Sequence, residues 1–373
     1  MPLRTNKSPA KIPRNKRVGR PSGKPFENRA ALDAAYVEAV SYEAKARKRR
    51  HRRHVVVLGI LLACVAAVLA LLINQQAIMD WWALRHYQAP AAISSLANQD
   101  AMTDYATKVF YVNHPAIETG ANFATPCPND GGEQTIVLGC YHSDQRGIYV
   151  LGVSDPLLNG VEQVTAAHEM LHAAYDRLSP SERKKVDAML EDYYQHDLHD
   201  QRLLDTIAAY KKTEPKDVVN EMHSIFGTEV TTLPANLEQY YQRYFTDRHQ
   251  VAALAAKYQN EFTSRQNTIA QDDTRLTAMK LQITDQETAL RVKLSGINSQ
   301  QANLLALRSS NVGAYNSAVP GYNRQVDAYN SGVQQLHQLI DQYNKLVASR
   351  NAVALEEDQL VKELSSNTST LNQ

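Results

Sequence analysis

Cysteine is scarce in this chain of 373 residues, which contains only Cys64, Cys127 and Cys140. No two of them form a CxxC pair, which argues against a zinc site built from cysteines. Cys64 lies inside an apolar run, where we expect it to be inert. Cys127 and Cys140 are thirteen positions apart. We expect them to form a disulfide if this part of the chain lies outside the cytoplasm.

The net charge is also small, at +1, yet the two signs are unevenly distributed. Residues 1–54 contain sixteen Lys and Arg against four Asp and Glu, so the remainder is acidic. Residues 1–30 hold five prolines among scattered basic residues, a composition that cannot bury enough apolar surface to fold. We predict a basic, mostly disordered cytoplasmic tail over residues 1–54, with a short helix at 30–46. The basic run at 45–54 is typical of a topology signal beside a membrane, and we expect no nucleic-acid partner.

One long hydrophobic run, Val55–Ile73, has nineteen residues and no charge. At ~1.5 Å per residue a helix of this length spans roughly 28 Å, which matches the core of a bilayer. Basic flanks stay in the cytoplasm, so we predict a single-pass protein of the cell membrane with a transmembrane helix at 55–74. The N-terminus is then cytoplasmic, residues 75–98 form a juxtamembrane linker, and the remainder is extracytoplasmic. Three aromatic residues that suit the far interface follow the run: Trp81, Trp82 and Tyr87.

Residues 99–248 are predicted to form an α+β domain with a small sheet and several helices. A helix is expected at 92–107. Short runs rich in β-branched and aromatic residues indicate three strands. The predicted strands are Lys108–Asn113, Thr135–Tyr141 and Gly147–Val153. Three more helices are expected: Val161–Leu178, one that begins at Ser179 with a capping box to Glu182, and one that begins at Thr213 and ends at Gly227.

Residues 249–373 are predicted to form a long coiled-coil arm, because apolar residues recur there at intervals of seven. The first series is Phe262, Ile269, Leu276, Ile283, Leu290, Ile297 and Leu304, and the second is Val333, Ile340, Val347, Ala354 and Val361. A break at Asn311–Tyr322 separates them, which indicates an antiparallel helical hairpin. A solvated single helix is the alternative. The arm is a candidate surface for a protein partner.

The chemistry of the chain is concentrated in the pentapeptide His168-Glu169-Met170-Leu171-His172, an HExxH motif within the helix expected at 161–178. Residues four apart share one helix face, so both imidazoles can reach one ion. Glu169 then lies beside the metal, where a carboxylate can take a proton from a bound water. Two solvated histidines on an ordinary helix are the alternative reading.

A catalytic zinc site has three protein ligands and one open position, so a third ligand is expected from a later element. Glu221 is the preferred candidate, because a helix that returns antiparallel to the first can present it to the metal. His223 is the main competitor, although it points elsewhere on its helix if Glu221 faces the metal. Glu229 is a further alternative.

The two segments HEMLH and NEMHS together resemble the gluzincin metallopeptidases, whose pattern is HExxH on one helix and NExxSD on a later one. The resemblance implies Zn²⁺ held by His168, His172 and Glu221, with Glu169 as the general base. It looks closer to the minimal gluzincins, with a small sheet and a few helices, than to the two-domain enzymes.

Three further positions match the family's pattern around the ligands: Asn220, Ser224 and Asp176. The chain departs from it at Ile225, where the family has an Asp that orients the first histidine. The resemblance therefore implies that another group accepts the hydrogen bond of His168, or that the site is weaker.

The expected function is a membrane-anchored, zinc-dependent endopeptidase that cleaves a peptide or protein substrate outside the cell. An alternative is a surface interaction protein with a degenerate metalloprotease-like domain and a binding arm, and another is a purely structural metal. The donor for the developing oxyanion stays unassigned. Its candidates are Tyr175, His223, Tyr240, Tyr241 and Tyr244.

Overall fold

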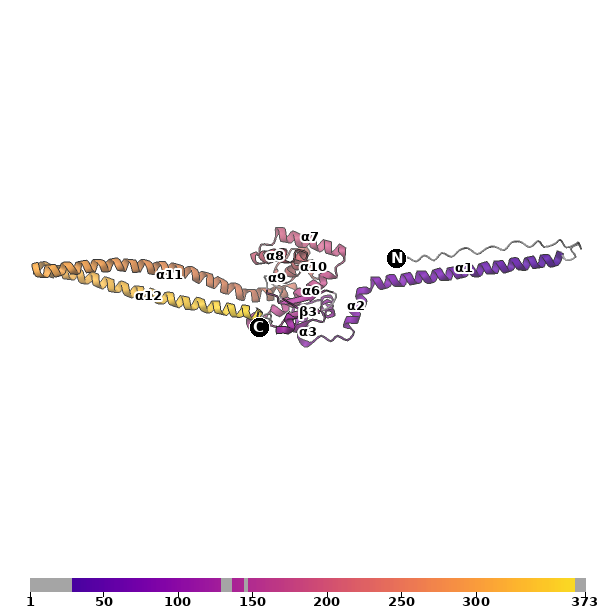
Figure 1. The fold of residues 1–373 in the computed structure, drawn as a ribbon, viewed down its shortest axis with the longest axis horizontal. Coiled ribbons are helices and arrows are strands. Elements are labelled where there is room, and N and C mark those ends of the chain that lie inside the picture. The colour runs from indigo at the N-terminus through magenta and orange to yellow at the C-terminus, as the bar shows by residue number, and fades with distance from the viewer. Residues whose placement is uncertain (1–28, 129–135, 144–146, 366–373) are drawn as a thin grey trace, which may run out of the picture. The chain divides into compact units, whose positions relative to one another are not determined.

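The computed structural model describes residues 29–128, 136–143 and 147–365, which divide into one unit ending at Ile78 and another beginning at Met79 (Figure 1). The described part of the chain is mostly helical, with one small sheet. Its short elements, which connect the larger ones, are α3 (Ala91–Gln99), α5 (Gly120–Ala124), the 3₁₀ helix η1 (Pro156–Leu158) and α10 (Ala235–Tyr241).

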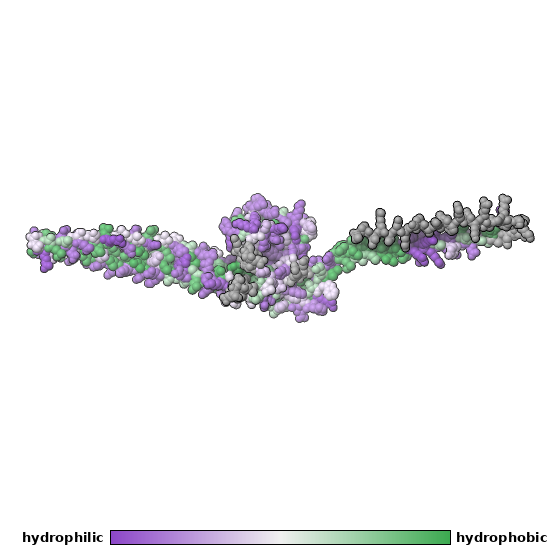
Figure 2. Space-filling view, viewed as in Figure 1, coloured by the Kyte–Doolittle hydropathy of each residue, from purple (hydrophilic) through white to green (hydrophobic). Residues whose placement is uncertain are grey.

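The first unit contains one long helix, α1 (Arg29–Ile73), which joins the predicted short helix and the predicted transmembrane run into a single element. Its segment Leu32–Ile73 is long and apolar enough to cross a membrane, and its most apolar window is not buried by protein. Figure 2 shows one part of this helix as a hydrophobic, green surface and another part, with the basic residues, as hydrophilic and purple. Residues 1–28 of the predicted tail lie outside the described residues.

The strand predicted at Lys108–Asn113 is wrong, because Lys108–Val112 belong to helix α4 (Asp104–Val112) and Asn113 is its C-cap. Thr103 caps this helix by accepting a hydrogen bond from the N–H of Ala106. The apolar residues of the run then lie on the buried side of the helix. A short apolar run fits a buried helix and a strand equally well, and the cap decides between them here.

The sheet has three strands in the order β1-β3-β2: β1 (Ala116–Glu118), β2 (Gly139–His142) and β3 (Gly147–Leu151). β1 is parallel to β3, and β2 is antiparallel to β3 and forms an edge. The predicted strand at Gly147–Val153 is confirmed, and β2 overlaps the one predicted at Thr135–Tyr141. β1 is additional.

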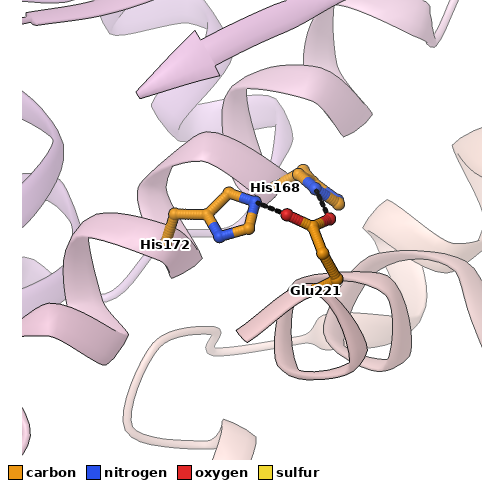
Figure 3. Close-up of side chains that lie close together, drawn as sticks. All are labelled: His168, His172 and Glu221. Atoms are coloured by element: carbon orange, nitrogen blue, oxygen red, sulfur yellow. Dashed lines mark ion pairs between the residues drawn. The ribbon is translucent and has the colours of Figure 1, made fainter. Parts of the chain in front are cut away.

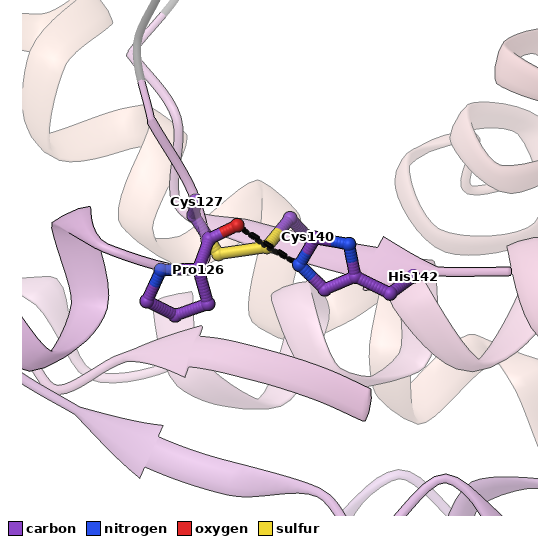
Figure 4. The surroundings of a disulfide bond; sticks show 4 residues. All are labelled: Pro126, Cys127, Cys140 and His142. Carbon is purple, nitrogen blue, oxygen red and sulfur yellow. Dashed lines mark hydrogen bonds between the residues drawn. A yellow bond between two sulfur atoms is a disulfide. The ribbon is translucent and has the colours of Figure 1, made fainter. Parts of the chain in front are cut away.

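A disulfide links Cys127 to Cys140 of β2, with a Cα–Cα distance of 5.7 Å, as the sequence predicts (Figure 4). His142 Nε2 lies 2.9 Å from the carbonyl oxygen of Pro126, so a polar contact accompanies the covalent link. Together they hold the segment before the disulfide against the outer strand of the sheet.

The larger helices of the second unit are α6 (Val161–Asp176), α7 (Pro180–His196), α8 (Gln201–Thr213) and α9 (Val218–Glu229). The helix predicted at 161–178 is confirmed, as is the capping box of α7 at Ser179 and Glu182. The helix start predicted at Thr213 is wrong, because Thr213 ends α8 and α9 begins at Val218.

Gly227 was expected to end its helix, but α9 continues past it to Glu229. The glycine is needed there for close packing: a Cβ at this position would lie 2.4 Å from Leu171 Cδ1 and 2.8 Å from Tyr241 Cε1. Gly227 therefore lets α9 approach α6 closely, which brings the two helices of the candidate site together.

Two long helices, α11 (Arg248–Ser310) and α12 (Val312–Ser365), form the C-terminal hairpin and lie side by side (Figure 1). Asn311 alone separates them, so the break expected over Asn311–Tyr322 is shorter than predicted. Pro320 lies inside α12. The heptad packing of a true coiled coil stays a prediction.

The beginning of α11 and the end of α12 both pack against the α+β domain. Three residues in the first turns of α11 are fully buried in the main core: Val251, Ala252 and Ala255. Near the end of α12, Leu360 and Leu364 pack against Leu158 and Val161. The core therefore extends beyond the boundary expected at residue 248.

Candidate metal centre

Helix α6 carries both histidines of the HExxH motif and is buried along almost its whole length. Gly160 precedes it with φ of 117°, a conformation that favours glycine. A Cβ at Gly160 would lie 2.9 Å from the carbonyl oxygen of Leu254, so α6 begins directly against α11. This packing fixes the helix on which His168, Glu169 and His172 are carried.

Helix α9 presents Glu221 from its first turn to the two histidines. His168 Nε2 lies 3.6 Å from Glu221 Oε2, and His172 Nε2 lies 3.5 Å from Glu221 Oε1 (Figure 3). The three ligand atoms of this group all lie within 4.8 Å of one another. The predicted third ligand therefore reaches the HExxH motif.

The spacing of these atoms fits a tetrahedral ion better than a direct hydrogen bond. Nitrogen–oxygen hydrogen bonds are usually about 2.7–3.2 Å long, shorter than both contacts. Nitrogen and oxygen ligands bind zinc at about 2.0–2.2 Å, which separates two ligands of one tetrahedral ion by roughly 3.4 Å. The donor set of two imidazoles and one carboxylate is also that of a zinc site. The residues present therefore fit Zn²⁺.

The carboxyl group of Glu221 is held in its ionised form, as a metal ligand must be. Burial alone would raise its pKa, but electrostatic interactions with His172 and His168 and polar contacts with His168 and Tyr210 outweigh this effect. The pKa of Glu221 is therefore lower than usual. A carboxylate binds a cation in its ionised form, and the lower pKa favours this form.

A cleft of about 700 Å³ contains the cluster. Its walls come from the segment 136–141, from α6, α8 and α9, and from Tyr258 of α11. Glu169 lines the cleft beside the two histidines and is otherwise buried. The edge strand β2 passes next to it, because a Cβ at Gly139 would lie 3.0 Å from Glu169 Oε1.

No protein-family model, curated protein or solved structure matches this chain. The interpretation of the site therefore depends on its own geometry and chemistry.

The two rival third ligands lie elsewhere. His223 is fully buried behind the cleft, with its Nε2 2.9 Å from the hydroxyl of Tyr240. Burial lowers the pKa of His223 to about 3, with a smaller contribution from the charges of His172 and His168. Glu229 lines the cleft but accepts 2.7 Å hydrogen bonds from Arg202 and Gln259.

The three flanking positions of the family pattern differ in their surroundings. Asn220 and Asp176 line the cleft, and Asp176 forms a 3.8 Å ion pair with Arg183. Ser224 is fully buried, and its hydroxyl has no hydrogen-bond partner among the described residues. Ile225, where the family has an Asp, is buried in the apolar core. A carboxylate at that position would lose solvation without a site prepared for it.

The five residues considered as oxyanion donors do not line the cleft. Tyr175 donates a 2.7 Å hydrogen bond to Asp187. The other four form one buried group, in which the hydroxyls of Tyr240 and Tyr244 are 3.1 Å apart and Tyr241 donates to the carbonyl of His223.

The structure reveals Tyr210 as a cleft residue that the sequence analysis missed. It lies on α8, a helix that was not predicted, and it interacts with Glu221, which lowers the pKa of that carboxyl. The signal for this helix was present: Asp200 accepts from the N–H groups of Arg202 and Leu203 as an N-cap, and Leu203 and Ile207 follow at helical spacing.

Proposed function

We propose that this protein is a zinc-dependent endopeptidase of the gluzincin type, anchored in the membrane with its catalytic domain outside the cytoplasm. The observation that carries the proposal is the arrangement of His168, His172 and Glu221 at the spacing of zinc ligands, beside Glu169 in an open cleft. A structural zinc site is closed by four protein ligands, whereas a catalytic site keeps one position for water. Three ligands that line a cleft favour the catalytic type.

Bound zinc would supply an activated water and polarise the carbonyl of the scissile bond. Glu169 is the residue that accepts the proton of this water and delivers it to the leaving amine. It is suited to this role because it lies one position from His168, lines the cleft and is shielded from bulk solvent. It is not a member of the ligand group itself.

Tyr210 is the proposed donor to the oxyanion that develops on the substrate carbonyl. It lines the cleft and interacts with the ligand Glu221, so it lies close to the proposed position of the metal. A pre-positioned donor of this kind stabilises the transition state more than the ground state. Among the described residues β2 is the outer strand of the sheet and lies along the same cleft, a position that suits a peptide in extended conformation.

The disulfide supports an extracytoplasmic location of the catalytic domain. Disulfides persist in oxidising compartments and are rare in the cytosol. The Cys127–Cys140 bond lies in the unit that follows the apolar helix, while the basic run at 45–54 precedes it. Both features favour a cytoplasmic N-terminus and an extracytoplasmic second unit.

The decisive experiment measures zinc content and cleavage of a random peptide library by the full chain and by Glu169→Gln. We expect one zinc per chain in both proteins and cleavage by the wild type only. Asp205→Asn, an exposed carboxylate substitution on α8, serves as the matched control. Zinc binding without cleavage by the wild type would favour an interaction protein with a degenerate peptidase domain.

A further inference from the structure

Helix α2 (Gln75–Leu84) and the residue after its end present an unusual outward face. Trp81 and Trp82 are 58% and 61% exposed, although they are the only tryptophans of the chain. Their rings form a T-shaped pair with centroids 5.4 Å apart. The guanidinium of Arg85 lies 5.7 Å and 5.3 Å from the two ring centroids. An aromatic pair with a cation above it is thus displayed to the exterior.

The opposite face of α2 is attached to the folded domain through a buried carboxylate. Asp80 is only 3% exposed and accepts two hydrogen bonds from Arg177, at 3.0 and 3.1 Å. Lys108 Nζ of α4 lies 2.9 Å from the same carboxylate. Removal of one partner of such an ion pair leaves the other charge buried without compensation. Asp80 therefore holds α2 firmly in place.

Two more contacts continue this attachment beyond Asp80. His114 Nε2 lies 2.9 Å from the carbonyl oxygen of Ala83. The rings of Tyr87 and His114 are stacked, with centroids 4.7 Å apart and planes 3° from parallel. The segment from Asp80 to Tyr87 is thus packed against the domain and does not behave as a loose linker.

The polarity of α2 is the reverse of that expected for a surface helix in water. Such a helix buries its apolar face and exposes its charged face. Here a carboxylate faces the protein and two tryptophans face outward. Tryptophan is enriched where a protein meets the headgroup layer of a bilayer, and arginine binds lipid phosphate groups there.

We infer that Trp81, Trp82 and Arg85 lie in the headgroup layer of the membrane that α1 crosses, and that Asp80 fixes the catalytic domain to this layer. The position of these residues in the sequence indicates that the bilayer covers this surface. Only seven residues separate Ile73, the end of the apolar run, from Trp81. At ~1.5 Å per residue this keeps the tryptophans at most roughly 12 Å from the hydrocarbon, and a tilted helix brings them closer to the headgroup region, which is roughly 5–8 Å thick on each side.

The attachment has a consequence for the domain, because Arg177 directly follows α6, the helix of the candidate metal ligands. A domain that contacts the headgroup layer acts close to the lipid surface. Its substrates are then proteins or peptides that are themselves held at the membrane. This last step depends on the proposed peptidase function, whereas the lipid contact depends only on the proposed membrane span.

The test uses the intrinsic tryptophan fluorescence of the full chain, which reports on this surface alone. The chain is reconstituted, one copy per disc, into nanodiscs of phosphatidylcholine and phosphatidylglycerol. One set of discs contains lipids brominated near the carbonyl end of the acyl chains. We expect strong quenching by the brominated lipids and protection from acrylamide in the water. Trp81→Phe and Trp82→Phe, each with a single remaining tryptophan, should both be quenched.

Each alternative outcome overturns a defined part of the inference. Free access of acrylamide without quenching by brominated lipid would place the helix away from the bilayer. Protection from both quenchers would mean that protein, not lipid, covers the surface. A chain that does not enter nanodiscs would remove the membrane span as well. Asp80→Asn tests the attachment, because tryptophan anisotropy should decay faster in this variant than in the control Asp104→Asn.

Discussion

The backbone of Gly139 in the edge strand lies against the carboxylate of Glu169 in α6, so closely that a Cβ would lie 3.0 Å from Glu169 Oε1 and 2.4 Å from Thr165 Cγ2. Neither distance is compatible with an unshifted side chain. The approach of this strand therefore sets the position of the proposed general base.

Gly139→Ala is expected to displace Glu169 while the zinc ligands stay in place. Zinc stoichiometry should be unchanged, and turnover should fall by up to ~10²-fold, because a shift of about 1 Å is enough for such a loss. Zinc analysis and steady-state kinetics measure the two effects. Gly313→Ala is the control, since its nearest side-chain atom lies at 3.6 Å. Equal turnover in both variants would show that β2 does not position the base.

Features that depend on a short stretch of sequence could be predicted correctly. The capping box at Ser179 and Glu182, the spacing of His168 and His172, and the pairing of the two cysteines all depend on short segments. The structure brings these residues together as expected, and it also places Glu221 at the histidines.

The remaining elements depend on tertiary packing. Lys108–Asn113 resembles a strand in composition, but the cap at Thr103 begins a helix there, and the apolar side of this helix packs against α6. Gly227 resembles a helix end but permits close contact between α9 and Leu171. Tyr210 has no motif of its own, since its role follows only from where α8 packs. Gly139 offered a weak signal, because an isolated glycine in a strand often marks a close approach.

Removal of a single ligand should abolish zinc binding. Glu221→Ala and His172→Ala each leave two ligands, so we expect loss of zinc together with loss of cleavage. Glu229→Ala is the matched control, because Glu229 lines the same cleft but pairs with Arg202. It should retain zinc. Metal analysis after dialysis measures the outcome, and full zinc in Glu221→Ala would disprove the proposed ligand set.

Asp100 is expected to make the fold less stable as pH rises. Its carboxyl is fully buried, and neither oxygen has a hydrogen-bond partner among the described residues. Burial raises the pKa of Asp100 well above its ordinary value. Between the unfolded and folded pKa values the folded state keeps a proton that the unfolded state releases. The free energy of unfolding then falls by up to about 1.4 kcal/mol per pH unit.

Asp100→Asn should therefore stabilise the protein at neutral pH, since the amide is uncharged and similar in shape. Urea unfolding from about pH 5 to about pH 8 should show a smaller decline than in the wild type. Asp104→Asn, an exposed change at the start of α4, should keep the wild-type slope. A wild-type stability that does not decline over this range would contradict the prediction.

The distal part of the helical hairpin is expected to be dispensable for catalysis. The beginning of α11 and the end of α12, which pack against the domain, are expected to be required. The contacts of Asp273 with Arg350 and of Gln266 with Glu357 give the antiparallel register. Deletion of residues 276–303 and 320–347 removes four heptads from each helix and preserves this register. The shortened protein should bind zinc and cleave a small peptide.

A chain that ends at Asp247 should fail to fold, because it lacks the fully buried Val251, Ala252 and Ala255. Circular dichroism and zinc content distinguish the two truncations. A folded, zinc-loaded but inactive short-hairpin protein would mean that the distal arm completes the active site.

Tyr210→Phe gives the sharpest test of how the transition state is stabilised. Loss of one oxyanion donor typically lowers kcat by ~10²–10³-fold, and KM should change little because the ground-state carbonyl gains less from the donor. Inhibition by a phosphonate peptide, whose tetrahedral oxygens mimic the transition state, should weaken in proportion to the loss of kcat/KM. Tyr194→Phe is the control, because its ring contacts Lys211 of the same helix α8 at 4.0 Å but lies outside the cleft lining. Reduced zinc affinity in Tyr210→Phe would instead show that the hydroxyl positions Glu221, and unchanged kinetics would place the oxyanion donor elsewhere.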